Sequence, residues 1–155
     1  MAKKNSYDDV DELLRDIKSD IQDTLLDEVL DEVKRIEIEH VRDDVFGVYK
    51  PSIYERRNSG GIDDPDNIVG ELYDMRLEID NITQFNTGYG TFNKGYNLSE
   101  LINDGSRLEG YFYDYPGEFN NPRPFIDNTI DDIERTDDVE NALAKGLKRR
   151  KYDIS

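Results

Sequence analysis

The sequence predicts an α+β fold, in which a long N-terminal helix and a C-terminal helix pack on one face of a small, mainly antiparallel β-sheet. Residues 1–45 contain neither glycine nor proline and place apolar side chains at helical spacing. Residues 46–123 hold 10 of the 11 glycines and most aromatic residues, which is typical of strands and loops. Residues 124–155 return to helical spacing and end in a basic tail. Because 155 residues amount to one domain, we expect a single core within residues 1–155.

The first region predicts one long acidic helix over about residues 7–42. Ser6 is the expected N-cap, and Asp9 three residues later completes a weak capping box. Such a helix would span about 54 Å at 1.5 Å per residue, which is more than a compact domain of this size requires. We therefore expect either that part of the helix projects from the fold or that it breaks, at residues 19–20 or 37–39.

The middle region predicts the sheet. Residues 69–83 alternate apolar and polar side chains, which indicates one long strand or two short ones, and residues 108–115 form a second strand candidate rich in aromatic side chains. Residues 86–97 between them read as a loop of glycine and aromatic residues. A short helix is expected to follow, capped by Asn97 at its start and ended by Gly105.

The last region predicts a second helical segment. Pro122 and Pro124 suit the start of a helix, because proline is tolerated in the first turn. The helical spacing slips at residues 135–136, where Asp137 is placed to cap a new start. The basic residues of the segment 145–151 match the negative end of the helix dipole. We interpret them as a solvated helix end in preference to a phosphate-binding or acid-binding patch.

Composition excludes several classes of function. The 36 acidic and 20 basic residues give a net charge of −16, which opposes binding to DNA or to anionic membranes. The absence of cysteine excludes disulfides, zinc–thiolate sites and thiol nucleophiles. No apolar run is long enough to span a bilayer, and the first residues lack the apolar block of a secretory signal. We therefore expect no membrane partner, no specifically bound DNA, and a protein that works in the compartment where it is made.

The sequence offers little catalytic machinery. His40 is the single histidine and is expected at the surface or at the boundary of the core. No serine stands in a nucleophile motif, and no glycine motif suits a phosphate. We therefore predict no catalytic residue and no cofactor, although paired carboxylates are not specific evidence in a chain with so many acids.

The acids of GGIDDPDN, residues 60–67, are the densest loop cluster, but they do not fit the calcium-loop pattern. A turn is the favoured interpretation, with Pro65 fixing the backbone and Asp64 or Asn67 bonding to nearby amides. We predict no metal site; a metal-dependent hydrolase built on these acids is the least favoured hypothesis.

The segment YKPSIYERRNSGGIDDPDNI, residues 49–68, resembles a block found in the tail-completion or head–tail joining (neck) proteins of long-tailed bacteriophages. Ile62 replaces the usual leucine of that block, and Ser106 stands after Gly105 where the family often has histidine. The segments LSELINDG and RPFIDNTIDDIE resemble two helices of the same family. The matching residues of the block are Tyr49, Pro51, Tyr54, Arg56, Arg57, Gly60, Gly61, Asp64, Asn67 and Ile68.

The resemblance implies a non-enzymatic virion structural protein at the neck or tail terminus, assembled as a homo-oligomeric ring, hexameric by analogy. Its partners would be further copies of itself and other neck, tail or connector proteins, with carboxylates facing a channel through which DNA passes unbound. An intramolecular turn that only holds the sheet together is the alternative interpretation of the block. The predicted interface residues are Tyr49, Pro51, Tyr54, Arg56, Arg57, Gly60, Gly61, Asp64, Tyr89 and Tyr96.

A function of a different class also fits the composition. Residues 1–45 hold 15 of the 36 acids, and carboxylates spaced like phosphates can occupy the basic groove of a DNA-binding enzyme. The chain would then be an acidic DNA mimic that inhibits a host nuclease or restriction system. The tyrosine, arginine and glycine block favours the structural protein, because a mimic does not need it.

Overall fold

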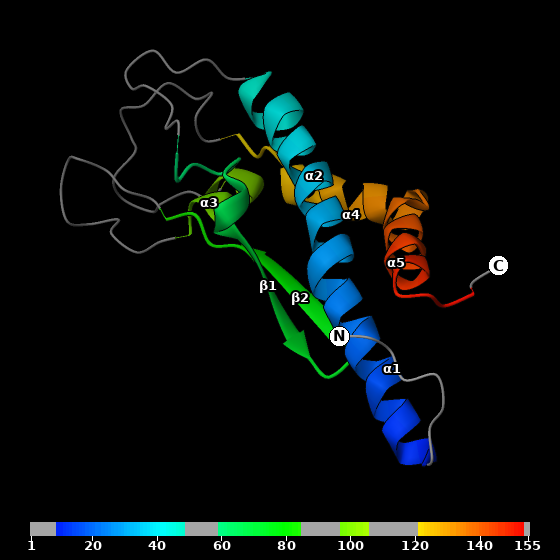
Figure 1. Cartoon of the computed structure of the whole chain (residues 1–155). Coiled ribbons are helices and arrows are strands. Elements are labelled where there is room, and N and C mark those ends of the chain that lie inside the picture. The colour runs from blue at the N-terminus through cyan, green and yellow to red at the C-terminus, as the bar shows by residue number, and fades with distance from the viewer. Residues whose placement is uncertain (1–8, 49–58, 85–96, 106–120, 154–155) are drawn as a thin grey trace.

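The computed structural model describes residues 9–48, 59–84, 97–105 and 121–153, and it confirms the predicted α+β class. A long N-terminal helix runs through the molecule, with a two-stranded hairpin beside it and two C-terminal helices packed against it (Figure 1). No helix among the described residues is long and apolar enough to cross a membrane. The helices and strands are α1 (Val10–Thr24), α2 (Leu30–His40), β1 (Ile68–Tyr73), β2 (Arg76–Asn81), α3 (Leu98–Asp104), α4 (Phe125–Arg135) and α5 (Asp138–Arg149).

The long helix is continuous from Val10 to Phe46, about 55 Å at 1.5 Å per residue. It does not break at residues 19–20 or 37–39, so of the two expected outcomes the break is not found. The winding widens instead in two π-helical segments, Leu25–Val29 and Val41–Phe46, which keep the helix unbroken. Polar side chains alone therefore do not end this helix, because helices packed along its length hold it together.

The start of the helix also differs from the prediction. The first helical residue is Val10, and the N-cap is Asp9, whose carboxylate accepts a hydrogen bond of 3.0 Å from the amide of Asp11. The predicted cap, Ser6, lies outside the described residues. The first turns of α1 extend past the hairpin (Figure 1), so the expected projecting part is found at the N-terminal end.

The hairpin confirms the two-strand interpretation of residues 69–83. Strands β1 and β2 pair antiparallel, with Ile68 opposite Asn81 and Tyr73 opposite Arg76. Asp74 in the turn between them has a φ of 59°, a left-handed conformation that aspartate tolerates better than most residues. The second strand candidate, residues 108–115, lies outside the described residues.

Helix α3 begins and ends where the sequence predicts. The Asn97 side chain accepts a hydrogen bond of 2.9 Å from the amide of Ser99, and Gly105 ends the helix with a φ of 58°. The isolated bridge between Gln84 and Asn97 joins this cap to the end of the hairpin.

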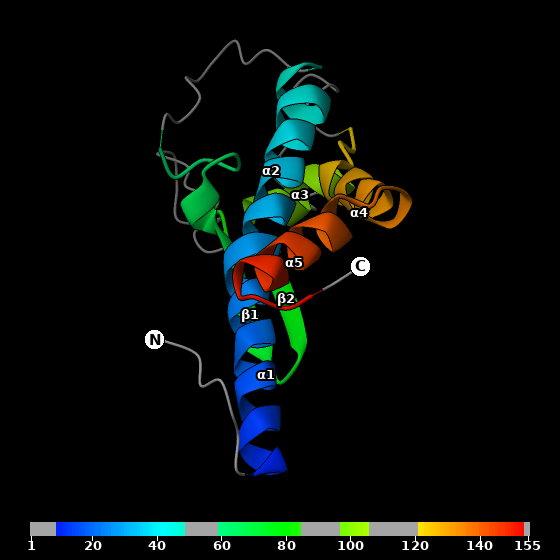
Figure 2. The ribbon, with the colours of Figure 1, turned by 45° about the vertical axis from the view of Figure 1, so that its right-hand side comes forward.

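The C-terminal region forms two helices separated at the predicted slip. Helix α4 ends at Arg135, and α5 restarts at Asp138 after the N-cap position Asp137, whose side chain makes no capping hydrogen bond. Helix α4 crosses α2, while α5 packs against the first π segment (Figure 2). In Figure 1 the hairpin and α5 lie on opposite sides of the long helix.

The main core lies toward the C-terminal end of the long helix. It joins Val41 and Val45 of that helix to Ile62 of the following loop and to Phe125 of α4, and all four side chains are buried. Phe46 and residues of α3 and α4 pack around these four. The core therefore fixes the loop, while the N-terminal end of α1 stays away from it.

Candidate functional site

Seven of the ten predicted interface residues lie outside the described residues, and three lie in the loop at residues 59–67. These three are Gly60 and Asp64, which are partly exposed, and Gly61, which is buried. The seven outside are Tyr49, Pro51, Tyr54, Arg56, Arg57, Tyr89 and Tyr96.

The loop is a turn built around Asp64. Its carboxylate accepts hydrogen bonds from the amides of Gly60, at 2.6 Å, and Asp66, at 3.0 Å. These bonds, the one from Gly60 first, lower the pKa of Asp64 because they stabilise its charged form. Gly60 has a φ of 69°, which glycine adopts without strain. The predicted turn is confirmed, and the Asp64 carboxylate stabilises it through these two hydrogen bonds.

The inner side of the loop is bound to the hairpin. The carbonyl of Gly61 accepts hydrogen bonds from the Asn67 side-chain amide, at 2.8 Å, and from the Thr83 hydroxyl, at 3.1 Å. Ile62 then enters the core. The loop is therefore held in one position relative to the sheet, which a docking loop needs if it is to bind without a large ordering cost.

Asn81 is the centre of a buried polar network. Its amide nitrogen donates to the Glu37 carboxylate, at 2.7 Å, and to the Ile62 carbonyl, at 2.9 Å. Its amide oxygen accepts from the backbone amide of Thr83, at 3.2 Å, and from the Thr83 hydroxyl, at 2.6 Å. Burial raises the pKa of Glu37, and the hydrogen bond from Asn81 offsets part of that rise.

The same residue ties α3 to the sheet. The backbone carbonyl of Asn81 accepts from the Asn97 side chain, at 2.9 Å, and from the Ser99 hydroxyl, at 2.8 Å. Sequence reasoning missed this network. The sequence did contain the signal. Asn81 lies on the same face of the strand as Leu77 and Ile79, and a polar residue on an apolar face needs buried hydrogen-bond partners.

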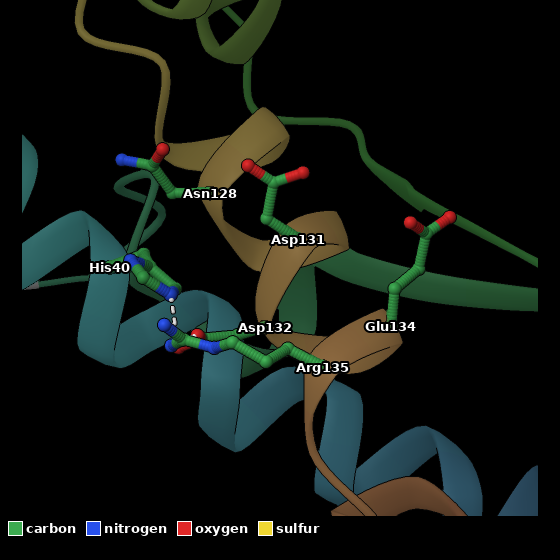
Figure 3. Close-up of a pocket in the computed structure, with 6 residues that line it drawn as sticks. All are labelled: His40, Asn128, Asp131, Asp132, Glu134 and Arg135. Atoms are coloured by element: carbon green, nitrogen blue, oxygen red, sulfur yellow. Dashed lines mark hydrogen bonds and ion pairs between the residues drawn. The ribbon is translucent and has the colours of Figure 1, made fainter.

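His40 lies in a shallow cleft between the long helix and α4 (Figure 3). Its Nδ1 is 3.0 Å from Asp44 Oδ2, and its Nε2 is 2.9 Å from Asp132 Oδ2. Asn128 donates to the same oxygen of Asp44 at 2.8 Å. The hydrogen bond to His40 is the main cause that lowers the pKa of Asp132, and Arg135 adds to the effect.

This arrangement suits a clamp better than an acid–base centre. Both ring nitrogens of His40 already face carboxylates, so neither is left to exchange a proton with a substrate. Asp131 and Glu134 line the same cleft, but their side chains point away from His40 (Figure 3). Among the described residues, no group of three or more histidine, aspartate or glutamate side chains is arranged to hold a metal ion.

The basic end of α5 contacts the long helix, which corrects the interpretation of this end as simply solvated. Arg150 bonds to Glu28 at 2.9 Å and to Asp27 at 2.8 Å, and Arg149 pairs with Glu28. The Tyr152 hydroxyl donates to Asp20 at 2.6 Å. These contacts join residues more than 100 positions apart, so local sequence reasoning does not reveal them.

An exposed apolar surface lies at the free end of the long helix. Val10 is 68% exposed and Leu14 is 56% exposed, although both continue the apolar stripe of α1. Met75, in the hairpin turn beside the helix, is 41% exposed. We call Val10, Leu14 and Met75 the α1 tip. Val10 and Leu14 are four residues apart on one helix face, and contiguous exposed apolar side chains commonly mark contacts with other proteins.

Comparison with known proteins extends over nearly the whole described fold. The model of the YomN family matches residues 9–149, from the N-cap of α1 to the last residue of α5. The chain belongs to the YomN family. A relative in this family is the SPbeta prophage-derived uncharacterized protein YomN of Bacillus subtilis (strain 168). It is 33% identical over 112 residues, which cover 71% of this chain and 69% of the relative.

Membership in the YomN family supports a phage origin for this chain, because the relative is prophage-derived. The predicted resemblance to phage proteins is confirmed at this level. The comparisons do not name a neck or tail-completion family. No solved structure matches the chain.

Proposed function

We propose that this YomN-family chain is a non-enzymatic structural protein of a phage particle. It acts at the neck or tail terminus, as a homo-oligomeric ring that is hexameric by analogy. Its partners are its own copies and other neck, tail or connector proteins. It belongs to the virion after assembly in the host cytoplasm.

The α1 tip is the observation that carries this proposal. A structural protein acts through contacts, and the tip offers apolar side chains on a rigid helix that extends past the rest of the fold (Figure 1). Fully burying a side chain such as Leu14 against a partner contributes about 1.5–3 kcal/mol. The prophage-derived relative supports the setting in which such a partner would be found.

The charged surface supports a role beside DNA without binding it. Several carboxylates on α1 are exposed, among them Asp11 and Asp23, and the net charge is −16. Like charges lower the affinity for the phosphate backbone, so carboxylates facing a channel would let DNA pass. An electrophoretic assay at low salt is expected to show no retardation of DNA, and clear retardation would contradict this part of the proposal.

The proposed homo-oligomer is tested by measuring the mass of the native assembly. Light scattering or native mass spectrometry of the purified chain, alone and with an extract of virion proteins, is expected to show a defined homo-oligomer or a complex with virion components. A chain that stays monomeric at every protein concentration and binds no virion protein would overturn the proposal.

The acidic DNA mimic is the second candidate, and one observation favours it. The long helix is one continuous element with exposed acids along it, as a mimic of a phosphate backbone would require. Arg149 and Arg150 work against it, because they cover Asp27 and Glu28 with positive charge. A pull-down from host extract separates the two, since a mimic would return a DNA-binding enzyme and a structural protein would not.

A further inference from the structure

The α1 tip faces the side of the long helix on which the hairpin lies. Lys18 pairs with the Asp74 side chain in the hairpin turn, and Gln22 donates to the Asp74 carbonyl at 2.7 Å. Leu14 precedes Lys18 by one helical turn, so it lies on the same side just past the end of the hairpin. A shallow depression lined by Leu14, Lys18, Asp11 and Arg15 opens there.

The surroundings of the tip are acidic. Asp9 and Asp11 are exposed at the start of α1, and Glu12 and Asp16 follow within two turns. Arg15 and Lys18 are the bases of this stretch among the described residues, and Lys18 is already paired with Asp74. The tip therefore combines exposed apolar side chains with a local excess of carboxylates, and a partner surface should be basic.

A basic surface is present on α5 of the same chain. Lys145 and Lys148 are exposed and lie about one turn apart on α5, and Lys151, which follows the helix, is also exposed. Arg149 and Arg150 are engaged with the long helix, whereas these three lysines form no ion pair with any residue in the described part of the chain. We call Lys145, Lys148 and Lys151 the lysine face.

We infer that the α1 tip of one copy docks on the lysine face of a neighbouring copy. This inference rests on the proposed homo-oligomer and names its contact. The partner is a second copy of this chain, because the acidic, apolar surface and the basic surface occur on the same chain but do not contact each other within it. Hairpin and α5 lie on opposite sides of the long helix (Figure 1), so the two surfaces face apart.

This geometry determines the kind of assembly. Two different surfaces in contact make a heterologous, head-to-tail interface, which repeats from copy to copy and closes into a ring when the rotation allows it. A twofold dimer would either place each surface on its own copy, carboxylates against carboxylates, or need both surfaces on one side of the chain, whereas they face apart. The head-to-tail contact is therefore the arrangement that the charges favour.

The apolar part of the contact is tested with Leu14→Ser, and Ile130→Ser serves as the matched control because Ile130 of α4 is 49% exposed but lies outside both surfaces. Light scattering over a concentration series measures the dissociation constant of the assembly. Leu14→Ser is expected to raise it about tenfold or more, and Ile130→Ser is expected to leave it unchanged. Circular dichroism checks that both variants fold.

The charged part is tested with Lys148→Glu and Asp11→Lys, each of which should also weaken the assembly about tenfold or more. The double variant should recover most of the loss, because it exchanges the charges across the contact. Arg42→Glu, an exposed reversal of the same size outside both surfaces, is the control. Raising the salt concentration should weaken the wild-type assembly in the same direction.

The outcomes separate this inference from the proposed function. A wild-type oligomer that is indifferent to the tip and lysine variants, or that is equally weakened by the controls, overturns the inference and leaves the proposed function standing. Failure of the double variant to recover assembly overturns the direct pairing of the two surfaces. A wild-type chain that stays monomeric at every concentration and with virion proteins present contradicts both.

Discussion

At the scale of single residues, the fold depends on a few buried polar groups. Asn81 uses its side chain and its backbone carbonyl to join the long helix, the loop at residues 59–67 and α3. A buried polar group is tolerated only when its hydrogen bonds are made, and the free energy of unfolding falls when one partner is removed. Glu37, which is buried, and His40, which is only partly exposed, each give a testable prediction.

Glu37 should make the free energy of unfolding fall as pH rises. Burial raises its folded-state pKa, so above the unfolded-state pKa the folded chain holds more protons than the unfolded chain, and stability declines until pH passes the folded value. Glu37→Gln keeps an oxygen for Asn81 and cannot ionise. Urea unfolding at several pH values should show a variant without this decline and at least as stable as wild type at pH 7.

A Glu37→Gln variant that keeps the wild-type pH dependence would show that another group causes it. Glu39→Gln, an exposed neighbour on the same helix, is the control and should leave the profile nearly unchanged.

His40 should stabilise the crossing of the long helix and α4. Replacing His40 with alanine leaves Asp44 and Asp132 without the ring between them, and their charges then repel. We expect His40→Ala to lower the free energy of unfolding at pH 6 by about 0.5–1.5 kcal/mol, the usual net worth of a hydrogen bond. Arg42→Ala, an exposed change two residues away, should cost less than about 0.5 kcal/mol in the same urea titration.

At the scale of elements, α5 is fixed on the long helix at three points. Arg35 of α2 bonds to Asp138 at the start of α5 at 3.1 Å, and Arg150 bonds to Glu28 near its end. Between them, Gly146 lies directly against Thr24 and Glu28. The close approach coincides with the first π segment, whose wider winding adjusts the position of side chains at the crossing.

Gly146→Ala tests this crossing. A Cβ atom at this position would lie 2.6 Å from Glu28 Oε2 and would also overlap the Thr24 side chain, so these side chains or the helices that carry them must shift. Overpacking of this kind typically costs about 1–3 kcal/mol, although alanine has the higher helix propensity. Thermal unfolding should report a lower midpoint for Gly146→Ala than for wild type. Asn141→Ala, at an exposed position of α5 outside both proposed surfaces, should not lower it, and a stabilised Gly146→Ala variant would contradict the close contact.

Local elements were predictable from the sequence where local chemistry decides them. The hairpin, the cap of α3 at Asn97 and the separation of α4 from α5 each depend on neighbouring residues. The Asn81 to Glu37 bond spans 44 positions and the Arg150 to Glu28 bond spans 122, so pattern reasoning did not find them. The helix breaks expected as one outcome are not found for the same reason, because distant helices support the long one. Of the candidate site, only the Asp64 turn was predicted and observed.

At the scale of the whole molecule, charge is distributed unevenly. Arg35 and Arg150 form ion pairs between helices where these cross, with Asp138 and Asp27. At the start of α1, in contrast, the carboxylates of Asp9 and Asp11 are exposed. The molecule thus has an acidic, apolar end and a separate lysine face. This polarity is what a repeating head-to-tail assembly requires, and it would keep DNA from binding to the acidic end.

The presence of the chain in mature particles tests the structural role most directly. Purified phage particles, washed at high salt, can be analysed by quantitative mass spectrometry against the major head and tail proteins. The proposed role predicts a constant small number of copies per particle, equal to the subunit number of the isolated assembly. A chain that is abundant in infected cells but absent from washed particles would contradict the central claim.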